Sequence, residues 1–204
     1  MKLVIIKYNA GNIQSVLNAL ERLGVNAVVT DDREQISGAD KVIFPGVGAA
    51  GSAMHSLKAG NLDHVIKDLR QPVLGICVGM QLLCAYSEEN DTTCLGVVPV
   101  SIKKFQAQSL NNGDPLKIPQ IGWNTIFDLQ SELFSGVHEN SFVYHVHSYY
   151  AEDSPYTIAK CNYGVSYAAA IRKDNFYGVQ FHTEKSAETG ERIIRNFLEL
   201  GKAK

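Results

Sequence analysis

The chain lacks the features that mark membrane-spanning and nucleic-acid-binding proteins. Its apolar runs are far shorter than the ~18 residues that a membrane-spanning helix needs. Acidic residues number 21 and basic residues 19, so the net charge is only −2 and no basic stripe suggests nucleic acid. We find no internal repeat and no low-complexity segment. The run that begins Met1-Lys2-Leu3 is typical of a short strand and not of a signal peptide.

Cysteine is also scarce, and its spacing excludes the common metal sites. The four cysteines show no C-x-x-C pair and no metal-ligand spacing: Cys77, Cys84, Cys94 and Cys161. Without a secretion signal, they are expected to be free thiols in a reducing cytoplasm. The sequence therefore predicts a cytoplasmic protein with no metal and no other cofactor.

What is present is the composition of an ordinary globular protein. Of the 204 residues, 45% are hydrophobic and 20% are charged. A chain of this length suits one folded unit with a substantial core. We therefore expect a single domain over residues 1–204.

The first 90 residues alternate between strand-like and helix-like patterns. Strands are predicted over residues 3–6, 25–30, 41–44 and 73–76. Helices are predicted over residues 13–23, in one or two pieces over 54–69, and directly after Cys77. Continuous apolar strands are typical of parallel strands that are buried on both faces. The order predicts an α/β fold with a doubly wound, mostly parallel central sheet flanked by helices.

The middle of the chain predicts a β-rich antiparallel extension of that sheet. Short strands are expected over residues 97–105, 116–118, 125–127, 157–159, 167–172 and 177–181. Residues 142–150 alternate, with Phe142, Tyr144, Val146 and Ser148 on one face and Val143, His145, His147 and Tyr149 on the other. Residues 106–115 are predicted to form an exposed loop. A last helix is expected over residues 187–200, with Ser186 as its N-cap.

The most informative segment places a cysteine between two glycines. Cys77 stands in the pattern Gly75-x-Cys77-x-Gly79, after an apolar strand and before a helix-compatible run. A strand, a sharp turn with a nucleophile at its apex and a helix make up the nucleophile elbow. Glycines on either side remove side chains that would clash as strand and helix approach. The alternative is that Cys77 is only a small buried hydrophobic residue.

A second motif far along the chain favours catalysis. A strand ends at His182, and Glu184 follows two residues later, so both side chains project to the same side of an extended backbone. The carboxylate can then orient the imidazole, as in a Cys-His-Glu triad. Cys77 and His182 both follow strands whose carboxyl ends meet at one edge of the sheet. Alone, His182 and Glu184 would be a surface histidine and a solvated carboxylate, but together with the elbow they indicate an active site.

A third motif, Pro45-Gly46-Val47-Gly48, follows the third predicted strand. Glycines there leave backbone N–H groups free to form an oxyanion hole. An ordinary glycine-rich turn is the alternative. A phosphate-binding loop is disfavoured, because neither G-x-G-x-x-G nor G-x-x-x-x-G-K-[ST] is present.

Together these three segments resemble the class I (triad) glutamine amidotransferases, and the similarity runs along essentially the whole chain. Further segments are most similar to the glutaminase subunits of imidazole glycerol phosphate synthase. They are Met80 before Gln81, Gly11-Asn12-Ile13-x-Ser15-Val16, Pro119-Gln120-Ile121-Gly122-Trp123-Asn124 and His147-Ser148-Tyr149.

The resemblance implies hydrolysis of L-glutamine to glutamate and ammonia. Cys77 would form a γ-glutamyl thioester, His182 would protonate ammonia and activate water, and Glu184 would orient His182. The oxyanion hole would come from the backbone of Gly46, Val47, Gly48 and Val78. The amino and carboxylate groups of glutamine would be held by Gln81, Ser148 and Tyr149.

The resemblance also implies a partner, a (βα)8 cyclase subunit in a heterodimer. The cyclase would take up the ammonia and make imidazole glycerol phosphate and aminoimidazole carboxamide ribotide in histidine biosynthesis, and glutaminase activity would be weak until it docks. The partner interface would include Trp123, Asn124, Lys185 and Asn12. We expect Trp123 in a polar turn at this interface, with a buried core tryptophan as the alternative.

Three departures from the family pattern stand out. Thr183 stands where proline is usual, which is expected to loosen the turn before Glu184; Gln120 replaces a common histidine; and residues 7–10 differ from the usual start. Other hypotheses remain at this point. They are a glutaminase subunit of the anthranilate or aminodeoxychorismate type, a non-catalytic docking homologue, and a cysteine peptidase on a similar sheet.

Overall fold

The computed structural model describes residues 1–8, 12–107 and 115–201. Parts of two predictions lie outside these residues, namely the loop over 108–114 and the N-terminal segment over 9–11. The first half of the chain alternates between strands and helices, as predicted. Its elements are β1 (Leu3–Ile6), α1 (Ile13–Arg22), β2 (Val28–Thr30), α2 (Arg33–Ser37), β3 (Lys41–Gly46), α3 (Ala50–Ala59), α4 (Leu62–Asp68), β4 (Val73–Cys77) and α5 (Val78–Leu83).

The second half is dominated by strands and ends in a long helix. Its elements are β5 (Tyr86–Ser87), β6 (Thr92–Thr93), β7 (Ser101–Lys104), β8 (Gln120–Phe127), η1 (Glu132–Phe134), β9 (Ser141–His147), β10 (Tyr149–Ala151), β11 (Thr157–Tyr163), β12 (Val165–Lys173), β13 (Phe176–Val179), η2 (Thr183–Lys185) and α6 (Ala187–Glu199). Here η denotes a short 3₁₀ helix.

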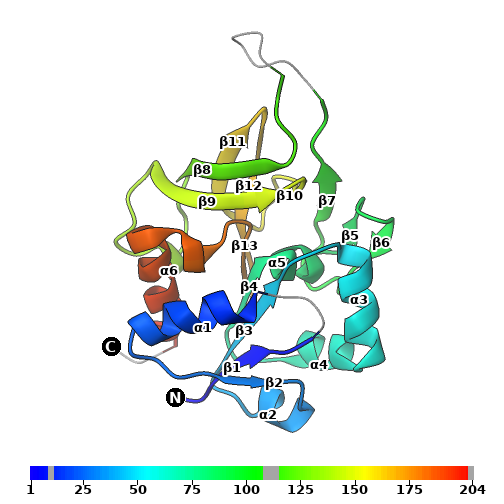
Figure 1. Cartoon of the computed structure of the whole chain (residues 1–204), viewed down its shortest axis with the longest axis vertical. Coiled ribbons are helices and arrows are strands. Elements are labelled where there is room, and N and C mark those ends of the chain that lie inside the picture. The colour runs from blue at the N-terminus through cyan, green and yellow to red at the C-terminus, as the bar shows by residue number, and fades with distance from the viewer. Residues whose placement is uncertain (9–11, 108–114, 202–204) are drawn as a thin grey trace.

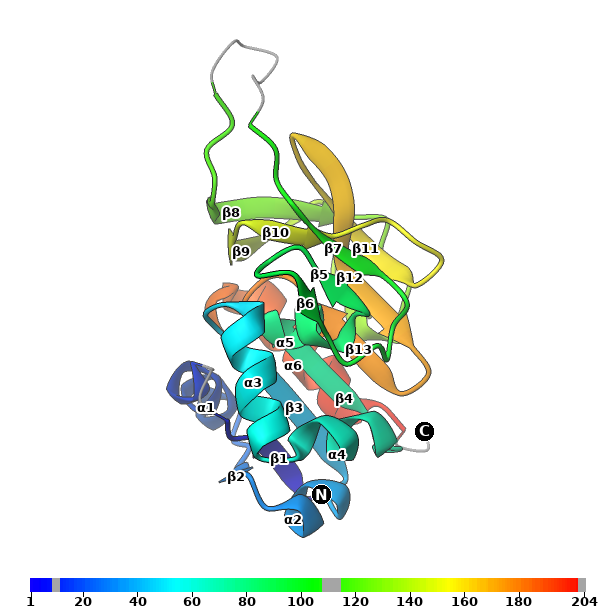
Figure 2. The same ribbon diagram turned by 90° about the vertical axis from the view of Figure 1, so that its right-hand side faces the viewer.

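One sheet joins both halves. Strands β2, β1, β3, β4 and β13 lie side by side in that order and are all parallel. Helices α1 and α6 lie on one side of this parallel part, and α3 and α4 lie on the other (Figures 1 and 2). Because both faces are covered, every residue of β1, β3 and β4 is buried. The predicted doubly wound parallel sheet is confirmed.

The antiparallel extension begins where β12 pairs with β13. From β12 the sheet continues to β10 and β7 in one direction, and to β11, β8 and β9 in the other. Strand β9 has the predicted alternation, with Val143, His145 and His147 buried and Phe142 and Val146 exposed. The β8–β9 pair lies above the carboxyl ends of the parallel strands (Figure 1).

Two predicted strands begin later than expected, because backbone groups at their predicted starts bond elsewhere. The N–H of Val25 donates to the Leu20 carbonyl of α1 at 2.9 Å, and β2 begins only at Val28. The Val98 N–H likewise donates to the Leu83 carbonyl at 2.9 Å, so the strand predicted over residues 97–105 is shortened to β7. The last predicted strand, over 177–181, corresponds to β13, which ends at Val179.

The prediction for residues 116–127 is wrong in two respects. Residues 116–118 are not a strand, and the strand expected over 125–127 is the end of the longer β8. Trp123 therefore lies in the middle of a strand and not in a polar turn. The reason is tertiary: β8 pairs with β9 over seven residues, and this pairing overrides the turn signal of Gly122 and Asn124.

Two further details differ from the prediction. The strand expected over 142–150 is interrupted at Ser148, between β9 and β10. Ser186 precedes α6, but its hydroxyl makes no cap hydrogen bond. Instead it donates to the His182 carbonyl at 2.6 Å and accepts from the Tyr144 N–H at 3.0 Å. Ser186 thereby ties the His182 loop to β9.

Candidate active site

The elbow at Cys77 has the predicted geometry. Cys77 is the last residue of β4 and has φ 54° and ψ −113°, a conformation with positive φ that side chains rarely adopt. Such strain typically costs on the order of 1–3 kcal/mol and persists only where the surroundings impose it. A Cβ atom on Gly79 would lie 1.8 Å from the Phe44 carbonyl oxygen, so only glycine permits α5 to approach β3 this closely. The close packing of α5 against the sheet thus holds Cys77 at the apex of the turn.

A pocket of about 300 Å³ opens at Cys77 and brings most of the predicted site together. Eight predicted residues line it: Val47, Gly48, Cys77, Val78, Gln81, Ser148, Tyr149 and His182. Gly46 is absent from the lining, because it ends β3 and packs against α5, where an added Cβ would lie 2.5 Å from the Gly79 nitrogen. Glu184 stands behind His182. Motifs that are far apart in the sequence therefore meet at one edge of the sheet.

Four further residues that were not predicted as site residues also line the pocket: Glu89, Pro119, Val146 and His147. Glu89 accepts a hydrogen bond from the Ala50 N–H at 2.7 Å, so its carboxylate is held at the start of α3. Glu89 follows the two-residue strand β5 in a polar segment without hydrophobic periodicity, so the sequence pattern did not indicate it. His147 could have been found from its place on the inner face of the predicted strand.

His182 and Glu184 form the predicted pair. The Nδ1 of His182 donates to Glu184 Oε1 at 2.7 Å, and both side chains are buried. This bond fixes the tautomer and leaves Nε2 for Cys77. Burial lowers the pKa of His182, but hydrogen bonds with the side chains of Cys77 and Glu184 outweigh it and raise the pKa to about 10. The imidazole is therefore a strong enough base to take a proton from a thiol.

The turn that carries this pair is closed by backbone hydrogen bonds. Lys185 N–H donates to the His182 carbonyl at 3.0 Å, and Ser186 N–H donates to the Thr183 carbonyl at 3.2 Å. The His182 N–H donates to the Tyr144 carbonyl of β9 at 2.9 Å. A threonine at position 183 thus forms a regular 3₁₀ turn, η2, without the proline that is usual there.

Replacing Glu184 with glutamine is expected to lower the pKa of His182, because the charged acceptor is lost while the shape is kept. A histidine whose pKa is higher in the folded than in the unfolded state stabilises the fold. For His182 this stabilisation is complete below the unfolded-state pKa of about 6.5, and it is lost as the pH rises through the folded-state pKa. The wild type should therefore exceed Glu184→Gln in stability most strongly near about pH 6 and least near about pH 10.

Histidine resonances followed by NMR report the pKa, and urea unfolding at several pH values reports the stability. Glu188→Gln on the exposed first turn of α6 is the matched control. An unchanged His182 titration in Glu184→Gln would contradict the pairing.

The cysteines and acidic residues do not gather into a further site. In the residues that the structure describes, no three or more His, Cys, Asp or Glu side chains are grouped to hold a metal ion. All four cysteines are buried and free. Within the same residues, no helix is both long and apolar enough to span a membrane.

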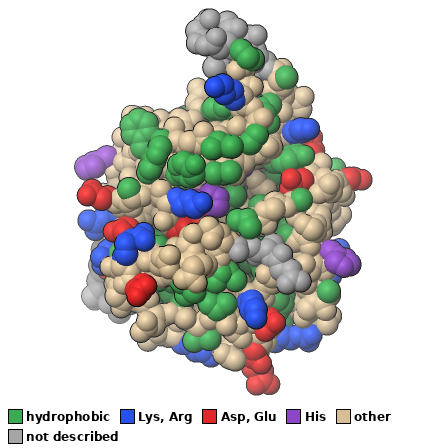
Figure 3. All heavy atoms as spheres, in the orientation of Figure 1, with side chains coloured by type: hydrophobic (Ala, Val, Ile, Leu, Met, Phe, Trp, Pro, Cys, Tyr) green, Lys and Arg blue, Asp and Glu red, His purple; other side chains and the backbone are tan. Residues whose placement is uncertain are grey.

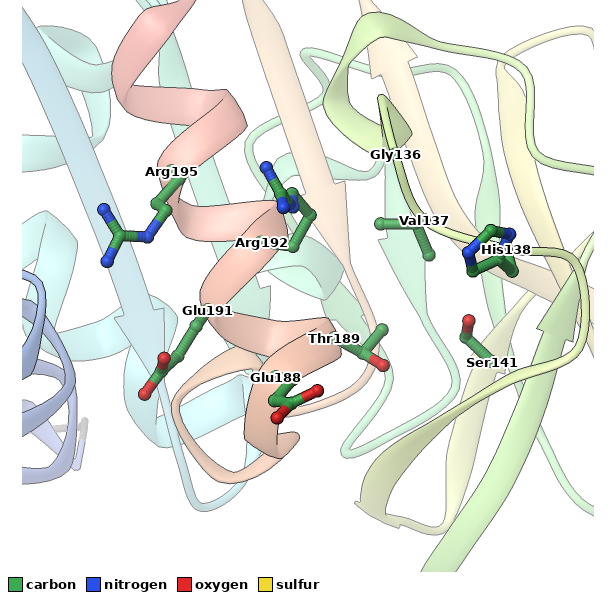
Figure 4. A pocket seen from close by; sticks show the side chains of 9 residues that line it. All are labelled: Gly136, Val137, His138, Ser141, Glu188, Thr189, Glu191, Arg192 and Arg195. Atoms are coloured by element: carbon green, nitrogen blue, oxygen red, sulfur yellow. The ribbon is translucent and has the colours of Figure 1, made fainter.

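A second and somewhat larger pocket, of about 400 Å³, lies between α6 and the segment before β9 (Figure 4). It is lined by Gly136, Val137, His138, Ser141, Glu188, Thr189, Glu191, Arg192 and Arg195. Arg195 points away from His138 and Ser141 in Figure 4, and Glu191 is paired with Arg22 at 3.1 Å. None of the triad residues lines it. We therefore assign the active site to the smaller pocket, which holds the nucleophile and the base.

Comparison with known proteins agrees with this geometry. Residues 4–200 match the family model for class-I glutamine amidotransferases. A protein of Bacteroides fragilis named imidazole glycerol phosphate synthase subunit HisH is 56% identical over 98% of this chain and 100% of its own length. A protein of the same name from Shewanella oneidensis is 47% identical over 97% of this chain and 95% of its own.

Solved structures share the fold. A putative GMP synthase protein from Thermoplasma acidophilum superposes with a TM-score of 0.73 at 22% identity, covering 97% of this chain and 92% of that one. A structure described as a glutamine amidotransferase also gives 0.73, at 15% identity and 98% coverage of both chains. The family model matches nearly the whole chain, and the two relatives are about half identical to it. The chain therefore belongs to the class I glutamine amidotransferase family.

Proposed function

We propose that the chain is the glutaminase subunit of an imidazole glycerol phosphate synthase. It hydrolyses L-glutamine to glutamate and ammonia, and it passes the ammonia to a (βα)8 cyclase subunit. The observation that carries this proposal is the meeting of Cys77, at a strained elbow, with the His182–Glu184 pair in one pocket. The names of the relatives favour this synthase over the anthranilate and aminodeoxychorismate types.

In the first half of the reaction Cys77 is acylated. His182 takes the proton of the Cys77 thiol, and Sγ attacks the carbon of the glutamine carboxamide. When the tetrahedral intermediate collapses, the carbon–nitrogen bond breaks and His182 gives its proton to the departing ammonia. The γ-glutamyl group stays on Sγ as a thioester. The Glu184 carboxylate holds the imidazole in the tautomer that both transfers need.

In the second half water releases glutamate. His182 takes a proton from a water molecule, which attacks the thioester carbon, and the carbon–sulfur bond breaks. The proton returns to Sγ as glutamate leaves. Each half restores the protonation state of His182, so one imidazole serves both halves.

The oxyanion of both intermediates needs N–H donors beside Cys77. Val78, directly after the nucleophile, lines the pocket together with Val47 and Gly48. Gly48 has φ 88° with open space around it, so this segment can turn an N–H toward the pocket at little cost. We assign the oxyanion hole to these groups, with Gly46 fixing the end of β3 behind them.

Glutamine would lie beside Gln81 and the β9–β10 junction, which line one pocket. The Nε2 of Gln81 donates to the Tyr149 carbonyl at 3.2 Å and to Gln180 Oε1 at 3.0 Å, which leaves its own Oε1 as an acceptor. That oxygen and the Glu89 carboxylate suit the α-ammonium group of glutamine. Ser148 and Tyr149 also line the pocket, and we propose that they bind the α-carboxylate.

The partner is proposed to dock on the outer face of the β8–β9 pair. This outer face consists of Ile121, Trp123, Phe142 and Val146, which are 62%, 52%, 59% and 36% exposed. Figure 3 shows apolar side chains gathered over β8 and β9. Clustered exposed apolar side chains of this kind mark interaction sites. The other proposed interface residues are the exposed Lys185 and the half-buried Asn124 and Asn12.

The outer face adjoins the active site through Val146. The Val146 side chain lies on the outer face and also lines the pocket, and its carbonyl accepts a hydrogen bond from Cys77 Sγ at 3.8 Å. A protein docked on this face would cover the pocket, so ammonia could pass to it without entering bulk water.

The test is glutamate release with and without the cyclase. Adding the cyclase together with its ribonucleotide substrate is expected to stimulate release by roughly 5- to 150-fold, the usual range of coupling between sites. Trp123→Ala should raise the dissociation constant by about 30-fold, which corresponds to about 2 kcal/mol at an anchor residue.

Val28→Ala is the matched control, because Val28 is an exposed apolar residue of the edge strand β2. If the isolated chain is as active as the complex, the proposed role of the partner is wrong. If Trp123→Ala and Val28→Ala bind equally well, docking does not use the outer face.

A further inference from the structure

Beneath the pocket lies a buried histidine cluster that the proposed reaction does not use. It consists of His145 and His147 on the inner face of β9, Tyr167 of β12 and Gln120 of β8, all buried. His145 Nδ1 lies 3.2 Å from His147 Nε2, and the Tyr167 hydroxyl lies 3.3 Å from both of these atoms. The same hydroxyl donates to Gln120 Oε1 at 3.0 Å. Four polar side chains from three strands therefore meet in the core.

The hydrogen bonds fix the proton on His147. Its Nδ1 lies 2.7 Å from the Tyr149 carbonyl, which can only accept, so Nδ1 carries the hydrogen. Burial lowers the pKa of His147 to about 4, so the ring is neutral near pH 7 and Nε2 is an acceptor. His145 Nδ1 is within reach as the donor to this acceptor, since the Tyr167 hydroxyl gives its one proton to Gln120. The cluster thus supports one tautomer of His147, with its N–H aimed at Tyr149.

The Tyr149 carbonyl connects His147 to the glutamine pocket. The carbonyl accepts a second hydrogen bond, from Gln81 Nε2 at 3.2 Å. It lies directly after the interruption at Ser148, and its two donors are side chains. Together with Gln180 Oε1, this carbonyl holds the amide nitrogen of Gln81, whose side chain lines the pocket.

We propose that His147 is a positioning residue for glutamine binding, acting through the Tyr149 carbonyl on Gln81. His145 and Tyr167 hold the His147 ring in place from below. The inference rests on the proposed glutaminase function and adds to it a residue that contacts neither the reacting carbon nor the leaving group. Because Gln81 binds glutamine before and during the reaction alike, loss of His147 should raise KM and leave kcat nearly unchanged.

Leucine and asparagine at position 147 form a matched pair, since they have nearly the same shape and only asparagine can donate a hydrogen bond. In the cyclase complex, His147→Leu should raise KM for glutamine by about ten-fold, with kcat within about three-fold, because one buried hydrogen bond is lost. His147→Asn should restore most of the KM. Burial or packing alone would affect both variants alike.

A double variant tests whether the effect passes through Gln81. In a Gln81→Ala background, adding His147→Leu should change KM by less than about two-fold, because residues that act through one contact are not additive. Tyr167→Phe keeps the buried ring and removes only the hydroxyl, and it should raise KM by about three-fold. This variant serves if His147→Leu does not fold, which melting temperature and circular dichroism would reveal.

Glutamate release by the wild-type complex separates the two proposals. If the wild type is active and His147→Leu binds glutamine normally, or if leucine and asparagine behave alike, the positioning role is wrong and the glutaminase function stands. Additive effects in the double variant also overturn the role. If the wild-type complex releases no glutamate, the proposed function fails and the positioning role fails with it.

Discussion

Cys77→Ala is expected to lower glutamate release by roughly 10³-fold or more in the cyclase complex, because removal of a triad nucleophile typically has an effect of this size or larger. Water cannot replace Sγ efficiently, since the site is built around attack by an atom fixed at the elbow. The fold should survive. Alanine keeps the Cβ atom, and apart from its hydrogen bond with His182, Cys77 Sγ makes long contacts with the Val146 carbonyl and the Gln180 amide, each at 3.8 Å.

Mass spectrometry gives the more direct measurement. Wild-type protein quenched in acid during turnover should carry a γ-glutamyl adduct on the peptide that contains Cys77, and Cys77→Ala should carry none. Cys94→Ala is the control, because Cys94 is buried outside the pocket and its thiol donates to the nearby Thr92 carbonyl at 3.6 Å. Turnover retained in Cys77→Ala would show that Cys77 is not the nucleophile.

Gly79→Ala should have the largest effect on folding. The new Cβ would lie 1.8 Å from the carbonyl oxygen of Phe44 and 2.9 Å from its carbonyl carbon. Both atoms belong to the backbone of the buried strand β3, so no side-chain rotation relieves the overlap. Helix α5 would have to move away from the sheet, which opens the core and removes Cys77 from its place. We expect a loss of several kcal/mol from a total that is typically 5–15 kcal/mol.

Gly60→Ala is the matched control for this prediction. A Cβ there would meet only ordinary contacts, 3.5 Å or more away, and the backbone φ of −84° suits alanine. It should leave the stability unchanged or raise it by a few tenths of a kcal/mol, since alanine restricts the unfolded chain. Chemical denaturation of both variants measures the difference. Equal midpoints for Gly79→Ala and wild type would contradict the close approach.

The sequence predicted those parts of the structure that depend on local pattern. The apolar run of β1 matches its bounds, and the spacing of Gly75, Cys77 and Gly79 predicted the elbow, because close packing leaves few residue choices. The His182–Glu184 pair was predicted on the assumption of extended backbone, but β13 ends at Val179 and the 3₁₀ turn η2 brings the two side chains together instead.

The parts that could not be predicted depend on contacts between distant segments. The neighbours of Trp123 in the sequence indicate a turn, yet pairing with β9 extends the strand through it. Glu89 enters the pocket because its carboxylate accepts from Ala50, 39 residues earlier. Ser186 bonds to Tyr144 and His182 in place of capping its helix.

Strand β9 divides its side chains by odd and even position. Even positions, such as Phe142 and Val146, form the outer face, and odd positions, such as His145 and His147, form the buried cluster. A strand has a period of two, so inserting or deleting one residue between Ser141 and His147 would exchange the two sets. The histidines would then reach solvent and the apolar side chains would enter the polar core. The length of this strand is therefore constrained more strictly than the identity of any one of its residues.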